Sequence, residues 1–224
     1  MIHTIVTPIK DAIAAMPLFT TGTDTRIAGI VLPVEKESDG RKFVFPASCD
    51  VDGKACWEQG RYFELLPNDL YRAVIYFEQL SGVRFTGYKD SKDSIMIYAC
   101  NVRLVGWLNL KKFGSTDCSI TSRLILGIIK TITANKGESS RTSGRFTVTD
   151  ADYTNTVVDV EPVQQVRQDA TIFSRYSVRR GNTSDNFFKE LLYPWDYFAL
   201  DLACTLYVGR ECFTEVVAGA EIEC

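Results

Sequence analysis

A chain of 224 residues with 46% hydrophobic and 24% charged residues has the composition of a globular protein that can bury its own core. The formal net charge of −3 gives no general attraction to nucleic acid, and lysine and arginine form no run longer than two. The longest apolar runs, such as 124–129, are far shorter than the ~20 residues of a membrane-spanning helix. Lys10 and Asp11 interrupt the N-terminal segment where a signal peptide needs apolar residues. We therefore expect one domain over 1–224, synthesised in the cytoplasm, with no membrane and no specific nucleic acid as its partner.

The first expected element is a short amphipathic helix that starts at Thr7 and Pro8. Threonine caps helices well, and proline favours the first helical position. Apolar residues then recur on one side of this helix until Pro17.

Strands are expected next over 26–34 and 42–47, because both are rich in β-branched and aromatic residues. A charged turn separates them. Residues 71–80 follow a turn at 67–69 and have the same composition, so they predict a further strand.

The longest regular pattern in the chain covers 94–113. Apolar and polar side chains alternate there, which predicts either one unusually long strand or two strands with a bulge near Gly106. The apolar face holds Met96, Tyr98, Cys100, Val102, Leu104, Leu108 and Leu110. The opposite face holds Asn101, Arg103, Trp107, Asn109 and Lys111.

A helix is expected to start at Ser119 or Thr121 and to extend to residue 134, since its apolar residues form one broad stripe. The polar, glycine- and serine-rich segment 135–145 predicts a mobile loop. Strands are then expected over 155–166 and 170–178, and a short helix over 184–192.

The last expected strand, 197–208, alternates almost without a break. One face is wholly apolar and the other is half polar, as in an antiparallel sheet with one side on the core. Leu202 belongs to the apolar face, and Asp201 to the face that is expected to be exposed. We predict an α+β fold, in which a mostly antiparallel sheet is packed by one central helix and by the short N-terminal helix.

No catalytic, cofactor or metal motif stands out in the sequence. The only histidine, His3, lies next to the N-terminus, and no nucleotide-binding or hydrolase motif is present. Seven cysteines include no C-x-x-C pair, so they indicate reduced structural thiols, with a Cys49–Cys56 disulfide as the alternative. We expect no enzymatic activity, no cofactor and no metal site.

Three stretches carry a resemblance to a known class of proteins: 61–80, 97–114 and 193–202. The last of them begins with the letters YPWDYF. Together with the order of helices and strands, these stretches resemble head-to-tail connector and tail-terminator proteins of tailed bacteriophages. The resemblance is greatest to those of crAss-like and other Bacteroidetes phages. The resemblance implies a virion structural protein that forms a homo-oligomeric ring between the portal and the tail.

The polar and aromatic residues on the second faces of the long strands are the candidates for contact between subunits. They are Arg103, Trp107, Trp195, Asp201 and Tyr207. If these side chains are exposed, Asp201→Ala should affect assembly and leave the fold intact. The alternative is a ligand-binding module with a groove lined by tryptophans, among them Trp57, Trp107 and Trp195.

Overall fold

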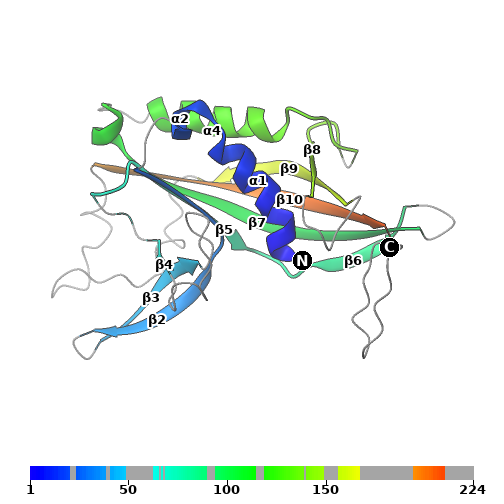
Figure 1. Cartoon of the computed structure of the whole chain (residues 1–224), viewed down its shortest axis with the longest axis horizontal. Helices are drawn as coiled ribbons and strands as arrows, with labels where there is room; N and C mark the ends of the chain where they lie inside the picture. The colour runs from blue at the N-terminus through cyan, green and yellow to red at the C-terminus, as the bar shows by residue number, and fades with distance from the viewer. Residues whose placement is uncertain are drawn as a thin grey trace.

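The structure of the chain is a computed structural model that describes residues 1–20, 24–38, 41–48, 63–65, 67, 69–89, 94–114, 119–138, 140–148, 156–166 and 194–209. A large, twisted sheet lies at its centre, with two long helices on one face and a small sheet on the other side (Figure 1). The helices are α1 (Ile2–Ala14), α2 (Pro17–Thr20), α4 (Ser119–Ile132) and the 3-10 turn η1 (Leu110–Phe113).

The large sheet has seven strands in the order β1-β5-β7-β10-β9-β8, and β6 pairs with one end of β7. All neighbours are antiparallel except β1 and β5, which run parallel. The mostly antiparallel α+β fold is therefore confirmed. These strands are β1 (Thr25–Ile30), β5 (Ala73–Gln79), β6 (Arg84–Tyr88), β7 (Ile95–Asn109), β8 (Gly144–Thr147), β9 (Val157–Val166) and β10 (Trp195–Gly209). The small sheet has the order β2 (Leu32–Ser38), β3 (Arg41–Ser48) and β4 (Phe63–Glu64).

Strands β7 and β10 form the spine of the sheet, and each has 15 residues. They pair without interruption from Ile95 opposite Gly209 to Asn109 opposite Trp195. The prediction of one long strand is confirmed, and the alternative of a bulge near Gly106 is wrong. Irregularities occur instead in β6 and where β10 pairs with β9.

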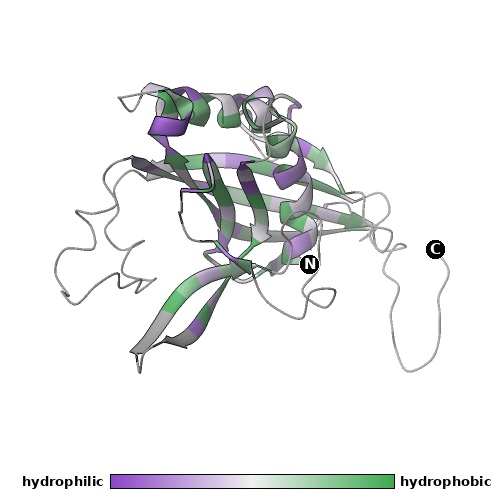
Figure 2. Ribbon diagram, turned by 60° about the vertical axis from the view of Figure 1, so that its left-hand side comes forward, coloured by the Kyte–Doolittle hydropathy of each residue, from purple (hydrophilic) through white to green (hydrophobic). Residues whose placement is uncertain are grey.

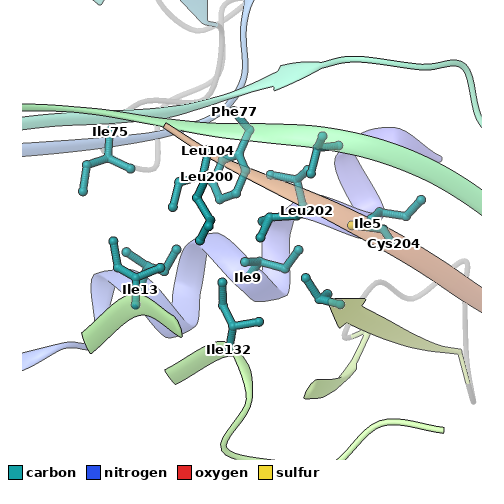
Figure 3. Close-up of a cluster of buried hydrophobic side chains, with 14 of the residues drawn as sticks. Ile5, Ile9, Ile13, Ile75, Phe77, Leu104, Ile132, Leu200, Leu202 and Cys204 are labelled. Carbon is teal, nitrogen blue, oxygen red and sulfur yellow. The ribbon is translucent and has the colours of Figure 1, made fainter. Parts of the chain in front are cut away.

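The main core lies between the large sheet and the helices. Alternate residues of β10, including Leu200, Leu202 and Cys204, point toward the isoleucines of α1 and α4 (Figure 3). The apolar faces predicted for the two long strands and for the central helix are therefore confirmed. Since burying one such side chain contributes about 1.5–3 kcal/mol, this cluster is the principal stabilising element of the fold.

Helix α1 starts at Ile2 rather than at Thr7, and Pro8 lies inside it. An internal proline costs about 3 kcal/mol because it loses one backbone hydrogen bond and crowds the preceding turn. The first turn compensates by burying Ile5 and Val6 completely or almost completely, at about 1.5–3 kcal/mol each. The predicted start at Thr7 is wrong because tertiary packing outweighs the local preference of proline.

The expected strand over 26–34 is two strands, β1 and β2, which separate at Val31. The backbone N–H of Val31 still donates to Phe77 of β5, and then Pro33 leads the chain away into the small sheet. The expected loop over 135–145 ends earlier than predicted, because Gly144 begins β8. Just before it, the backbone N–H of Gly137 donates to Ser143 O, and the N–H of Ser143 donates to Ser140 O.

Several predicted features lie outside the described residues. They are the strand over 170–178, the helix over 184–192 and the Cys49–Cys56 pair. Within the described ranges, no helix is both long and apolar enough to cross a membrane.

Candidate interaction surface

The candidate functional surface is the face of the large sheet that is turned away from α1 and α4. All five residues predicted as interface candidates belong to strands β7 and β10, and all have odd numbers. Because side chains alternate along a strand and the two strands are in register, these residues share that second face. Figure 2 shows polar and apolar segments interleaved along the long strands.

One end of the second face is an aromatic cluster. Trp107 packs against Tyr197, with ring centroids 4.9 Å apart, and its Nε1–H donates to the Tyr76 hydroxyl at 3.4 Å. Burial raises the pKa of Tyr76 well above its usual range. Leu65 belongs to the same cluster, so the segment that follows β4 helps to cover this end of the face.

This packing leaves little aromatic surface for a ligand. Trp107 and Trp195 are only 6% and 7% exposed, while Trp57 lies outside the described residues. The tryptophans of the described chain therefore pack against their own neighbours and do not line an open groove.

A charged row crosses the middle of the second face. Arg103 donates from Nε and Nη2 to the two carboxylate oxygens of Asp201, at 2.6 and 3.0 Å. Gln164 on β9 donates to Asp201 at 2.8 Å, and Glu78 on β5 lies opposite Arg103 in register. The hydrogen bond with Asp201 raises the pKa of the Arg103 guanidinium, so the guanidinium stays charged beside the carboxylate.

Arg103 and Asp201 are each 9% exposed, so they are buried with the tryptophans in the single chain. Four of the five candidates are thus buried by contacts within the chain. The expected exposure of Asp201 is wrong. Alternation along a strand shows that two faces exist, but it does not show which segments cover the second one.

The fifth candidate, Tyr207, lies in a charged network near the other end of the face. Lys89 Nζ and Arg145 Cζ lie 5.4 and 5.6 Å from the centre of its ring. Arg145 pairs with the fully buried Asp159 at 2.8 Å and with Glu138 at 2.8 Å, and Lys89 also pairs with Glu138. The turn before β8 and the end of β6 are therefore tied together around this tyrosine.

The ionisation of the network follows from these contacts. The hydrogen bond from Arg145, followed by that from Lys89, lowers the pKa of Glu138 to about 2. Asp159, followed by Glu138, raises the pKa of Arg145, and burial raises the pKa of Tyr207. Sequence reasoning missed this network, although an aspartate at position 159 between valines of a predicted strand was a usable signal.

A pair of exposed aromatic side chains of the large sheet lies on β6, which sequence reasoning did not assign as a strand. Phe85 and Tyr88 are 47% and 44% exposed. Their rings are 5.2 Å apart, and Phe85 also lies 5.6 Å from Tyr98 of β7. Among the described strands β6 pairs with β7 alone, so its other edge has no strand partner there.

Two cavities flank the start of β6, and the described residues that line them include no aromatic side chain. One of about 520 Å³ lies where β1 leaves β5, and Glu78 is part of its lining. The other, of about 450 Å³, is lined by Ser81, Gly82, Arg84, Ala99, Cys100 and Asn101. In the described part of the chain no three His, Cys, Asp or Glu residues are grouped so that they could hold a metal ion.

No characterised protein family matches the chain, and no curated protein is detectably similar to it.

Proposed function

We propose that the chain is a virion structural protein, a ring-forming subunit of the neck or tail of a tailed bacteriophage that joins the portal to the tail. In this proposal the protein has no catalytic role, and its partners are further copies of itself and the neighbouring portal or tail proteins. The resemblance of 61–80, 97–114 and 193–202 to connector and tail-terminator proteins is the sequence argument for it.

The observation that carries the proposal is the edge strand β6 with its exposed aromatic pair. A strand edge offers a row of N–H and C=O groups to another chain, and monomeric proteins normally cover or charge such edges. Here Phe85 and Tyr88 stand beside that edge and supply the apolar contact that a subunit interface needs. Tyr98 supports the pair from β7, so the patch is held in place by the sheet.

A rigid spine also supports a role in assembly. Strands β7 and β10 pair over their full 15 residues, and β6 extends from the same end of β7 as Tyr207. The ion pairs of Lys89 and Arg145 with Glu138 fasten that end to the turn before β8. A partner bound at β6 is therefore attached to a strand that pairs directly with the core strand β7. A head-to-tail contact at this edge builds a ring when the rotation between successive copies closes.

Quantitative mass spectrometry of virus particles purified from the source tests the proposal. The expected result is a constant ratio to the portal protein that corresponds to a small ring, on the order of six to twelve copies per particle. Absence of the chain from particles that contain the portal overturns the proposal.

A further inference from the structure

Two free cysteines face each other across the spine of the sheet. Cys100 in β7 is paired in register with Cys204 in β10, and both belong to the main core. They are 4% and 1% exposed. Figure 3 shows Cys204 among the apolar side chains under the sheet.

The register of the two strands brings the Cα atoms of the two cysteines within the range that a disulfide spans. Leu110 N–H donates to Pro194 O, which identifies the even-numbered residues of β7 as the hydrogen-bonded positions opposite β10. At such positions the two Cα atoms are about 5.5 Å apart, which falls within the commonest separation in disulfides, about 5.5–6 Å. Both side chains lie on the core side of the sheet.

The two thiols differ in access and in acidity. Cys100 is part of the lining of the cavity of about 450 Å³, whereas Cys204 is not, and Arg84 lines the same cavity. The hydrogen bond with Cys204 lowers the pKa of Cys100, and the same bond, followed by burial, raises the pKa of Cys204. This difference in access gives Cys100 the attacking role and Cys204 the resolving role.

We propose that Cys100 and Cys204 are a redox-active pair that a hydroperoxide converts into a cross-strand disulfide. In the first step the Cys100 thiolate attacks the peroxide, the O–O bond breaks, and a sulfenic acid forms while the leaving oxygen takes a proton and departs as water or an alcohol. In the second step the Cys204 sulfur attacks the Cys100 sulfur, the S–O bond breaks, and the hydroxyl departs as water with the thiol proton. The two sulfurs together lose two electrons, and the peroxide gains them.

Hydrogen peroxide added to the reduced, full-length protein provides the test. After the remaining thiols are alkylated in denaturant, peptide mapping should find Cys100 linked to Cys204, and dithiothreitol should release the link. The proposal is overturned if both residues stay alkylated at peroxide levels that oxidise a free thiol. It is also overturned if Cys100 advances to sulfinic acid while Cys204 remains a thiol, or if either residue links to a different cysteine instead.

Three variants separate this pathway from general oxidation. In Cys204→Ala, the sulfenic acid at Cys100 should persist and react with dimedone, because the resolving thiol is missing. In Cys100→Ala, Cys204 should stay reduced, because the cavity reaches only Cys100. In Arg84→Gln the disulfide should form several-fold more slowly, and Arg84→Lys should recover part of the rate, since the positive charge favours the thiolate. Rapid oxidation of Cys204 without Cys100 contradicts the assigned roles.

Discussion

Phe198 lies directly opposite Gly106 across the β7–β10 pair, and its ring covers the backbone of that glycine. A Cβ atom at position 106 would lie 2.1 Å from Phe198 Cε1, far inside van der Waals contact. The glycine therefore marks a close approach of an aromatic ring to a regular strand, not an interruption of the strand.

Gly106→Ala is expected to destabilise the protein by about 3 kcal/mol, because the added methyl group displaces a buried ring from a close-packed core. Urea denaturation followed by circular dichroism measures the effect. Gly82→Ala is the matched control, since a Cβ there meets no atom within 4 Å. Combining Gly106→Ala with Phe198→Ala should cost clearly less than the sum of the two single changes. Additive effects would show that the clash is not the cause.

The alternation of apolar side chains predicts the long strands and their core faces well. Leu202 and Cys204 are buried as expected, because a side-chain period of two allows only one face of a strand to meet the helices. The central helix was predicted for the same kind of reason, since its apolar stripe has the helical period. These are local patterns that continue over ten or more residues.

The features that were not predicted depend mainly on contacts between segments that are distant in the sequence. Arg103 and Asp201 are 98 residues apart in the chain, and no periodicity indicates that they pair. The start of α1 was misplaced because burial of Ile5 offsets the local cost of Pro8. Strand β6 was not predicted, because it has only five residues and contains Gly87, and glycine weakens the signal of a strand.

Asp201→Ala is expected to destabilise the chain by about 2–3 kcal/mol, since it leaves a buried guanidinium without its bidentate partner. This reverses the expectation from strand alternation that the fold stays intact. Chemical denaturation measures the change, and Asp11→Ala, an exposed aspartate on α1, should stay within about 0.5 kcal/mol of the wild type.

A double variant tests the cause of that loss. Replacing both partners, as in Arg103→Met with Asp201→Leu, should be less destabilising than Asp201→Ala alone, because no buried charge remains unpaired. If Asp201→Ala is as stable as the wild type, the ion pair contributes nothing to the fold.

Glu138→Gln should change how stability depends on pH. The pKa of Glu138 is lowered to about 2 in the folded chain, below the value of about 4.3 for an unperturbed glutamate. Its carboxylate therefore stabilises the fold fully above pH 4.3, and this contribution is lost as the pH falls from about 4.3 to about 2. Thermal melts of both proteins should differ at pH 7 and converge near pH 2.

Salt provides the control for this prediction. Because the Glu138 side chain is 48% exposed, 1 M NaCl should reduce the difference between the two proteins at pH 7. A difference that stays constant from pH 2 to pH 7 would mean that the glutamate acts through packing and not through its charge.

The double variant Phe85→Ser with Tyr88→Ser should separate folding from assembly. Both rings are about half exposed, so their removal should cost the monomer only about 1–3 kcal/mol, chiefly the two edge-to-face contacts among three rings. If β6 is the contact between subunits, this variant should fail to enter virus particles, while Leu126→Ser, an exposed apolar residue on α4, should enter normally. The measurement is the amount of the chain relative to the portal in particles made with each variant. Normal incorporation of the double variant would leave the virion location intact and exclude β6 as the interface. Loss of both variants would instead point to a general defect, which the melting temperatures of the purified proteins would reveal.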